Sequence, residues 1–325
     1  MEKQKRTLGV VIPVFNEEEV IGVTHKKIVE ELGSLEGYSL EITYIDDGST
    51  DNTAEILSRL ALENDNVKYI QLSRNFGHQC ALSAGLDHAS GDLIAVLDAD
   101  LQDPPQVVVS MIKLWEQGYE VIYGIRQKRK ESVFKRAAYN LFYKFWQYSA
   151  SIEVPLDAGD FCLMDRKVVN ALCALPENGR FVRGLRAWVG FKQIGLPYER
   201  MARYAGETKY PLSKLIKLSS DGIFNFSLLP LKLISIAGLI VFLAALLMIG
   251  LLLVVKLFDI SIFGHTLDEM PGYTSLAILF LFMSGTIMLC LGILGEYIGR
   301  LYDEVKRRPN YVIHTITHQS AKTHE

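Results

Sequence analysis

Cysteine is scarce in this chain: the 325 residues contain four, at positions 80, 162, 173 and 290, with no Cys-x-x-Cys spacing. A disulfide framework or a cysteine metal cluster is therefore not expected, and a reducing compartment is the simplest interpretation. A large charge of one sign is also missing, because 34 basic residues face 37 acidic ones. This balance argues against a general nucleic-acid-binding protein. No cleavable signal peptide is visible, since the apolar run after the basic start stops at Pro13.

Charge is absent from two long stretches in the C-terminal part. Leu233–Val255 and Thr274–Gly295 contain no Asp, Glu, Lys or Arg. As a helix, each would cross a hydrocarbon core of about 30 Å. The alternative is a pair of buried helices in a large soluble core, but two uncharged spans of this length rarely lie so close together in a soluble domain. Two transmembrane helices are therefore predicted.

Basic residues flank this predicted hairpin, and the loop between its spans holds one lysine, Lys256, against three acidic residues. The positive-inside rule then places both termini in the cytoplasm of a multi-pass plasma-membrane protein. Apolar and lysine residues alternate before the first span, which favours helices lying in the membrane interface. The predicted parts are a cytoplasmic domain at 1–210, interfacial helices at 211–230, a transmembrane hairpin at 231–299 and a cytoplasmic tail at 300–325.

Within the first 210 residues, apolar runs at 8–14, 40–45, 67–72 and 93–97 alternate with helical stretches. This order predicts βαβ units and an α/β fold with a mostly parallel sheet and helices on both faces. The run at 93–97 is typical of a strand buried on both faces, and it leads directly into Asp98 and Asp100. Because parallel strands present their carboxyl ends at one edge, Asp47 should converge there with Asp98 and Asp100.

Asp98 and Asp100 flank Ala99, so on a continuing strand they would share a face. Two carboxylates held together repel each other, and a divalent cation relieves that repulsion. Oxygen ligands of this kind suit Mg²⁺ or Mn²⁺. The alternative is a solvated Asp-rich turn, for which the following Asp103-Pro104 pair is ordinary.

Three segments carry a family resemblance: residues 11–18 (VIPVFNEE), 46–51 (DDGSTD) and 98–105 (DADLQDPP). In this order and spacing they resemble the inverting GT-A glycosyltransferases of family 2, whose fold is Rossmann-like. Within that family the sequence is most similar to the polyprenyl-phosphate glycosyltransferases of the dolichyl-phosphate mannosyltransferase group. With its two C-terminal spans it looks closest to the bacterial bactoprenol glucosyltransferases.

The resemblance implies inverting transfer of a hexose, with glucose favoured, from a UDP-sugar to undecaprenyl phosphate at the cytoplasmic face. The product would be a lipid-linked sugar for cell-envelope glycosylation, such as O-antigen modification of lipopolysaccharide. Other donors, of the GDP-mannose or UDP-aminoarabinose type, fit the same framework. A processive polysaccharide synthase and a non-catalytic nucleotide-binding membrane scaffold are further alternatives. Because two spans make a thin anchor, a homo-oligomer is expected.

The resemblance also assigns roles on the donor side. The nucleotide pocket would be lined by Pro13, Phe15 and Glu17, and Asp47 would bind the uracil or ribose. Asp98 would lie near the ribose and sugar, while Asp100 and Gln102 would hold the metal on the diphosphate. The donor phosphates would be touched by the basic loop containing Arg203 and Lys209, for which a plain juxtamembrane positive cluster is the alternative.

On the acceptor side, the resemblance places Arg126 at the acceptor phosphate, with Arg136 assisting. The alternative for this basic stretch is an exposed loop that touches anionic lipid. An inverting transferase usually needs a carboxylate base, for which Asp157 or Asp160 is available, and Asp157 is preferred. A phosphomonoester acceptor has a second pKa near 6, so it is largely ionised at neutral pH. Asp157 could therefore position the acceptor instead.

Overall fold

The computed structural model describes residues 5–126, 158–177, 180–201 and 272–318, with scattered helical positions between 231 and 254. The chain divides into two compact units. One combines residues 1–222 with residues 307–325, and the other comprises residues 223–306.

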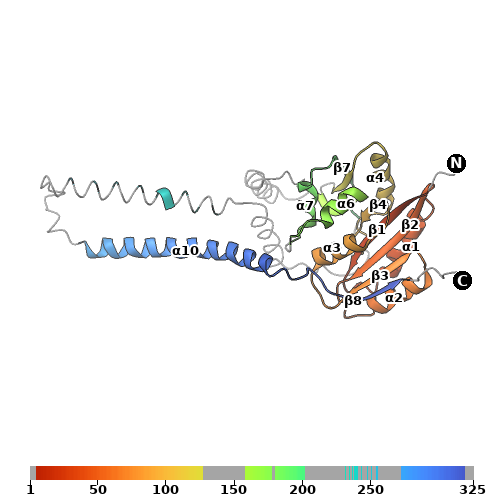
Figure 1. Ribbon diagram of the computed structural model, residues 1–325, viewed down its shortest axis with the longest axis horizontal. Coiled ribbons are helices and arrows are strands. Elements are labelled where there is room, and N and C mark those ends of the chain that lie inside the picture. Colours follow the sequence, from red (N-terminus) through yellow and green to blue (C-terminus); the bar gives the residue numbers. More distant parts are fainter. Residues whose placement is uncertain are drawn as a thin grey trace. The chain divides into compact units, whose positions relative to one another are not determined.

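A mixed β-sheet forms the centre of the first unit (Figure 1). Among the described residues its strand order is β7-β5-β6-β4-β1-β2-β3-β8. The strands are β1 (Arg6–Val14), β2 (Tyr38–Asp46), β3 (Val67–Leu72), β4 (Leu93–Val96), β5 (Val121–Arg126), β6 (Ala158–Asp165), β7 (Gln193–Tyr198) and β8 (Ile313–His318). The β3-β2-β1-β4 block is parallel, as is the β5-β7 pair, while β6 and β8 run antiparallel to their neighbours. The predicted α/β fold with a mostly parallel sheet is confirmed.

Helices cover both faces of this sheet. The helices of this unit are α1 (Ile21–Leu32), α2 (Thr53–Glu63), α3 (His78–His88), α4 (Gln106–Glu116), α6 (Arg166–Cys173) and α7 (Val182–Trp188). Side chains of α1, α2 and α4 share one core cluster with Val10 and Ile12 of β1. On the opposite face, α3 approaches so closely that a Cβ on Gly85 would lie 2.3 Å from Val11 and 2.7 Å from Ile45. Glycine at position 85 therefore permits this close contact.

Strand β4 explains why the acidic motif stands where it does. All four of its residues, Leu93–Val96, are buried, as expected for a strand covered on both faces. It pairs in parallel with β1, so the two strands end at the same edge of the sheet.

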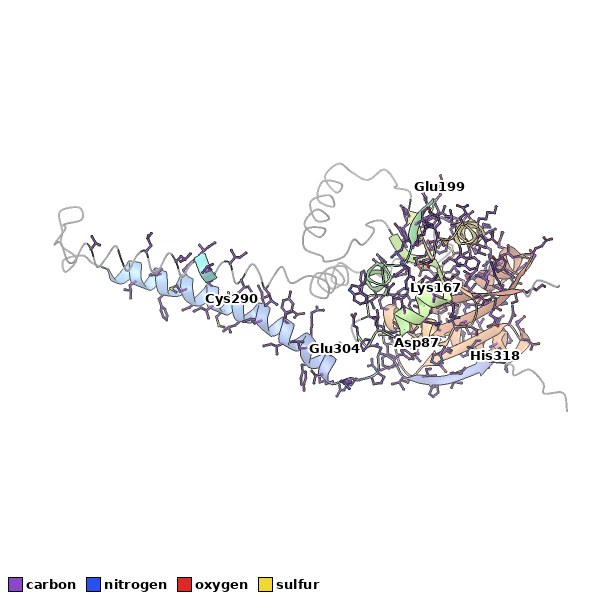
Figure 2. All side chains as sticks on the ribbon, turned by 45° about the horizontal axis from the view of Figure 1, so that its top comes forward. Asp87, Lys167, Glu199, Cys290, Glu304 and His318 are labelled. Carbon is purple, nitrogen blue, oxygen red and sulfur yellow. The ribbon has the colours of Figure 1, made fainter. Side chains whose placement is uncertain are left out.

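The C-terminal segment adds an edge strand that the sequence did not predict. Strand β8 pairs antiparallel with β3, with Ile316 opposite Ile70. The segment before it is held as well, since Ser73 donates its N–H to the carbonyl of Val312 (2.8 Å). Figure 2 labels Asp87, whose Oδ2 accepts a hydrogen bond of 2.9 Å from the hydroxyl of Tyr311. The predicted tail therefore contains a part of the sheet.

The second unit contains α10 (Tyr273–Val305), which is 33 residues long and therefore about 50 Å in length. The uncharged stretch 274–295 lies within it, and Glu296 and Arg300 then form an ion pair at 3.0 Å. Its described apolar side chains are largely exposed, including Phe280 (69%) and Met288 (69%), and they stand out from the helix in Figure 2. Among the described residues, one segment, Phe282–Val305, is long and apolar enough to cross a membrane.

Other membrane predictions fall mainly outside the described residues. The stretch Leu233–Val255 is described only at single positions, all of them helical. The interfacial segment at 211–230 is not among the described residues. The prediction of two spans and of interfacial helices therefore stays a prediction.

Candidate active site

The acidic residues follow strands that end together. Main-chain N–H groups of Asp47 and Leu97 donate to the carbonyls of Val14 (2.9 Å) and Val11 (3.1 Å), so β2 leaves the sheet at the end of β1 and β4 leaves it three residues earlier along β1. Asp47 and Asp98 are the residues at these exits. The strand ends meet at one edge, as the parallel topology predicts.

The loop after β1 is tied to the loop after β2. Asn16 adopts a positive φ of 52° and donates its N–H to Ser49 Oγ (2.9 Å). The N–H of Glu17 donates to Thr53 Oγ1 (2.9 Å). Of the three residues assigned to the nucleotide pocket, Pro13 is buried, Phe15 is exposed (36%) and Glu17 is half-buried. These contacts tie the main chain next to Phe15 to the loop after β2.

Asp47 organises the loop that precedes α3. Its two carboxylate oxygens accept hydrogen bonds from the N–H groups of Phe76 (2.7 Å) and Gly77 (2.9 Å). Burial raises the pKa of Asp47, and these two N–H groups oppose that rise. Gly77 has a φ of +101°, a conformation that favours glycine. Each oxygen of a carboxylate can accept more than one hydrogen bond, so this geometry leaves capacity for a ligand.

The acidic loop after β4 contains a residue in an unfavourable conformation. Leu101 has a φ of +57°, which costs a non-glycine residue about 1–2 kcal/mol. A hydrogen bond joins the two neighbours of Leu101, since the N–H of Gln102 donates to Asp100 Oδ1 (3.1 Å). The main-chain carbonyl of Gln102 accepts from the N–H of Met201 (3.0 Å), and the Gln102 amide contacts the Met201 carbonyl (3.5 Å). The segment after β7 therefore lies against this loop.

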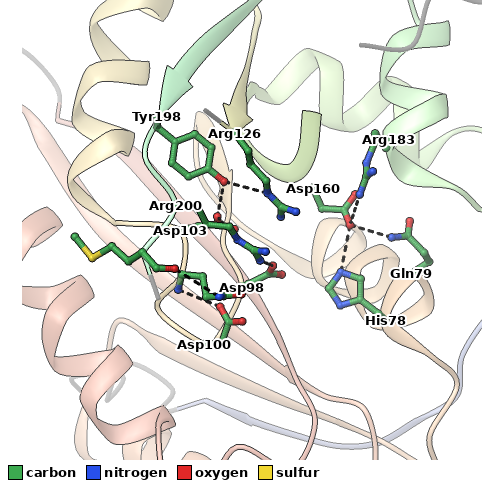
Figure 3. A network of polar contacts seen from close by, with 12 residues as sticks. His78, Gln79, Asp98, Asp100, Asp103, Arg126, Asp160, Arg183, Tyr198 and Arg200 are labelled. Carbon is green, nitrogen blue, oxygen red and sulfur yellow. Dashed lines mark hydrogen bonds and ion pairs between the residues drawn. The ribbon is translucent and has the colours of Figure 1, made fainter. Parts of the chain in front are cut away.

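A cluster of polar side chains lies beside Asp98 (Figure 3). The Tyr198 hydroxyl donates to Asp103 Oδ1 (2.5 Å), and Arg126 Nε donates to the Tyr198 hydroxyl (3.4 Å). Arg200 lies 3.6 Å from Asp103 Oδ1 through Nε and 3.9 Å from Asp98 Oδ2 through Nη2. Sequence reasoning missed Arg200, because nothing in its local pattern connects it with residues about 100 positions earlier.

A second cluster, centred on Asp160, faces Asp98 in Figure 3. Asp160 Oδ2 lies 3.4 Å from His78 Nε2, 3.4 Å from Arg183 Nη2 and 3.2 Å from Gln79 Nε2. Burial alone would raise the pKa of Asp160, but Arg183 and His78 hold it far below its usual range. A carboxylate with so low a pKa is a weak proton acceptor, so Asp160 is unsuited to be the general base.

His78 carries a positive charge in this environment. Burial lowers the pKa of His78, but the hydrogen bond to Asp160 and the charges of Asp98 and Asp160 raise it to about 9. Neither His78 nor Arg183 was among the residues singled out from the sequence. The basic character of His78 depends on carboxylates from β4 and β6, which only the folded chain brings near it.

Four of the predicted site residues, Asp157, Arg136, Arg203 and Lys209, lie outside the described residues. Their roles stay predictions. Arg203 comes two residues after Met201, which is bonded to the acidic loop through Gln102.

The carboxylates beside β4 fit a divalent cation. Burial raises the pKa of Asp98; His78 lowers it, while Asp103, Asp160 and Asp100 raise it further, to about 6. A divalent cation would relieve this crowding of negative charge. The described residues contain no group of three or more His, Cys, Asp or Glu side chains arranged for a metal. Mg²⁺ commonly takes one or two protein carboxylates together with substrate phosphates and water, which Asp98 and Asp100 can satisfy.

The comparisons with known proteins agree with this architecture. Residues 9–173 match the model of Glycosyl transferase family 2. The chain is 47% identical to "Uncharacterized glycosyltransferase YkcC" of Bacillus subtilis, over 94% of this chain and 92% of that protein. It is 39% identical to "Bactoprenol glucosyl transferase" of Shigella phage SfII, over 94% of this chain and 97% of that protein.

Among solved structures, it is similar to glucosyl-3-phosphoglycerate synthase from Mycobacterium tuberculosis in complex with Mn²⁺, UDP-glucose and phosphoglyceric acid. The identity is 21%, the match covers 68% of this chain and 79% of that one, and the TM-score is 0.45. The family assignment rests on the family model and the full-length relatives. The protein is a glycosyltransferase, and it belongs to glycosyl transferase family 2.

Proposed function

We propose that this protein transfers a hexose, with glucose favoured, from a UDP-sugar to undecaprenyl phosphate with inversion of configuration. The observation that carries the proposal is the carboxylate pair Asp98 and Asp100 after β4, at the same edge of the sheet as Asp47. The nature of the acceptor is supported by a relative named bactoprenol glucosyl transferase, which this chain matches over 94% of its length.

On the donor side, Asp100 and Gln102 would hold Mg²⁺ or Mn²⁺ on the diphosphate, and Asp98 would lie near the ribose and sugar. Such a cation stabilises the negative charge that gathers on a departing nucleoside diphosphate. The nucleotide pocket would be lined by Pro13, Phe15, Glu17 and Asp47, and the donor phosphates would be contacted by Arg203 and Lys209.

On the acceptor side, Arg126 and Arg136 would contact the phosphate, and Asp157 would be the base or would position the acceptor. The second pKa of a phosphomonoester is near 6, so its attacking oxygen is mostly ionised at pH 7. The low proton affinity of Asp160 supports Asp157 over Asp160 for any transfer of a proton.

The C-terminal part would anchor the enzyme in the plasma membrane. A hairpin at 231–299 would span it twice, interfacial helices at 211–230 would precede the hairpin, and the catalytic domain at 1–210 would face the cytoplasm with both termini. The exposed apolar helix α10 supports the second span. A thin anchor of this kind also favours a homo-oligomer.

A direct transfer assay tests the proposal. Purified full-length protein in lipid nanodiscs receives undecaprenyl phosphate, Mg²⁺ and one radiolabelled donor at a time, from UDP-glucose, UDP-galactose, GDP-mannose and a UDP-aminoarabinose derivative. We expect one sugar to appear on the lipid, β-linked when the donor is UDP-glucose, with UDP-glucose the best donor. Absence of lipid-linked sugar with every donor would contradict the proposal, and chains of several sugars would indicate a processive synthase.

A further inference from the structure

A cationic wall faces Asp98 across the site. It consists of His78 at the start of α3, Arg183 in the first turn of α7 and Arg126 at the end of β5. Figure 3 shows Asp98 between His78 and Asp160 on one side and Asp100, Asp103 and Arg200 on the other, with Arg126 connected to Asp103 through the Tyr198 hydroxyl. The pKa of Asp98 responds to charges from both sides, His78 and Asp160 on one and Asp103 and Asp100 on the other.

Asp160 links two residues of this wall, His78 and Arg183. His78, Arg183 and Gln79 all approach a single oxygen, Oδ2, while Oδ1 is buried and has no hydrogen-bond partner among the described residues. The buried Nε of Arg183 also has no hydrogen-bond partner there. A single oxygen of Asp160 thus serves two cations, and the charge of Asp98 also acts on His78.

Arg126 and Arg186 bring two further cations close to Asp160. The Arg126 guanidinium packs over Gly159, where a Cβ would lie only 3.0 Å from Nη2. Gly159 therefore leaves room for Arg126 next to Asp160. Arg186 is 2% exposed and reaches the Gly159 carbonyl at 3.5 Å from both terminal nitrogens. The side chains of His78 and Arg183 keep exposures of 34% and 27%, so an anionic ligand can reach them from solvent.

We propose that His78 and Arg183 bind the phosphate of the acceptor together with Arg126, and that Asp160 is the positioning residue that aligns them. This inference rests on the function proposed above. The donor diphosphate is assigned to Asp100, and an inverting displacement brings the attacking atom in on the face opposite the leaving group. The cationic wall is the cluster across Asp98 from Asp100.

The chemical step balances with the groups present. An ionised oxygen of the acceptor phosphate forms a bond to C1 of the sugar, while the bond between C1 and the β-phosphate oxygen breaks. The electron pair of that bond leaves with the nucleoside diphosphate, and no proton has to move. Protonated His78, with a pKa of about 9, and Arg183 offset the charge of the phosphate dianion as it approaches.

The test separates acceptor binding from donor binding. Full-length protein, His78→Gln and Arg183→Gln are titrated calorimetrically with farnesyl monophosphate, and separately with UDP and Mg²⁺. We expect each variant to bind farnesyl monophosphate about tenfold more weakly, or ~1.4 kcal/mol, the scale of one charge-assisted hydrogen bond. The affinity for UDP should stay within about twofold of the wild type. In steady-state assays, the KM for undecaprenyl phosphate should rise while that for the donor stays the same.

Two further variants make the result specific. His78→Lys keeps the positive charge, so it should recover most of the affinity for farnesyl monophosphate, which a purely structural role of the imidazole would not allow. Lys167→Gln removes a positive charge from an exposed ion pair with Glu120. Glu120 lies six residues before Arg126, at the other end of β5 and about 20 Å away. This control should leave both affinities unchanged.

Several outcomes would overturn the inference. Weaker binding of UDP with unchanged binding of farnesyl monophosphate would assign the wall to the donor. Equal losses in His78→Gln and His78→Lys would show that charge is not what binds. Normal sugar transfer by wild type, with unchanged farnesyl monophosphate affinity in both Gln variants, would refute this inference alone. Failure of the wild type to glycosylate any polyprenyl phosphate would refute the proposed function as well.

Discussion

Arg200 places its Nη2 atom 3.9 Å from Oδ2 of Asp98, although their strands are not neighbours. Arg200 follows β7 and Asp98 follows β4, and both β5 and β6 lie between these strands in the sheet. The segment after β7 must therefore cross the ends of two strands. It is held there by the main-chain hydrogen bond between Met201 and Gln102. This crossing segment forms the side of the site that contains Asp103 and Arg200.

On this side of the site, the Tyr198 hydroxyl stabilises the buried Asp103. Tyr198→Phe removes a hydrogen bond to a carboxylate that is 1% exposed. We expect the free energy of unfolding to fall by about 1.5–3 kcal/mol, as measured by urea denaturation. Tyr119→Phe is the control, because it keeps the aromatic ring under Lys192 Nζ (4.5 Å), and it should cost less than about 0.5 kcal/mol. Equal effects in both variants would contradict the assignment.

Two glycines should respond in opposite directions to alanine. A Cβ at Gly85 would overlap Val11 and Ile45, so Gly85→Ala should destabilise the protein by about 1–3 kcal/mol or more. Gly22 in α1 has no atom within 4 Å of its Cβ position. Gly22→Ala should therefore stabilise by about 0.5–1 kcal/mol, because alanine is the better helix former. Thermal unfolding of both variants measures this, and a loss in Gly22→Ala would count against the packing described for α1.

His78 should remain protonated well above neutral pH. Its pKa is raised to about 9 in the folded protein from an ordinary value of 6.5. The folded state binds this proton more tightly, so the associated stabilisation is complete below pH 6.5 and disappears as the pH rises through about 9. NMR titration of ¹⁵N-histidine-labelled protein should show the midpoint. In Asp160→Asn the midpoint should fall toward 6.5, and a wild-type midpoint near 6.5 would disprove the described environment.

Divalent cations should be required on the donor side. Removal of metal with EDTA should abolish sugar transfer and weaken UDP binding, and Mg²⁺ or Mn²⁺ should restore both. Asp100→Asn should lower transfer by about 100-fold or more, on the scale of losing one electrostatic stabiliser of the leaving group. Calorimetry of Asp100→Asn with UDP, in the presence and absence of Mg²⁺, checks whether the loss of transfer comes from the loss of a metal ligand. A variant that keeps Mg²⁺-dependent UDP binding would exclude Asp100 as a metal ligand.

The sequence by itself determined the parallel centre of the sheet and the place of its acidic motif. Leu93–Val96 is an apolar run too short for a helix. A strand that is covered on both faces of the sheet needs a continuous apolar run of this kind. The carboxylates that follow it must then stand at the carboxyl edge of the sheet, the same edge as Asp47. Order along the chain is enough for this conclusion, because parallel strands all end on the same side.

The tertiary structure alone decided which cations meet those carboxylates. His78, Arg183 and Arg200 come from three separate elements, and no local periodicity indicates that they approach Asp98 and Asp160. The same holds for β8, which pairs with a strand more than 200 residues earlier, as Ile316 opposite Ile70 illustrates. Hydrophobic periodicity reports how a segment is buried. Charge pairing depends on which distant segments the packed core brings within a few ångströms of one another.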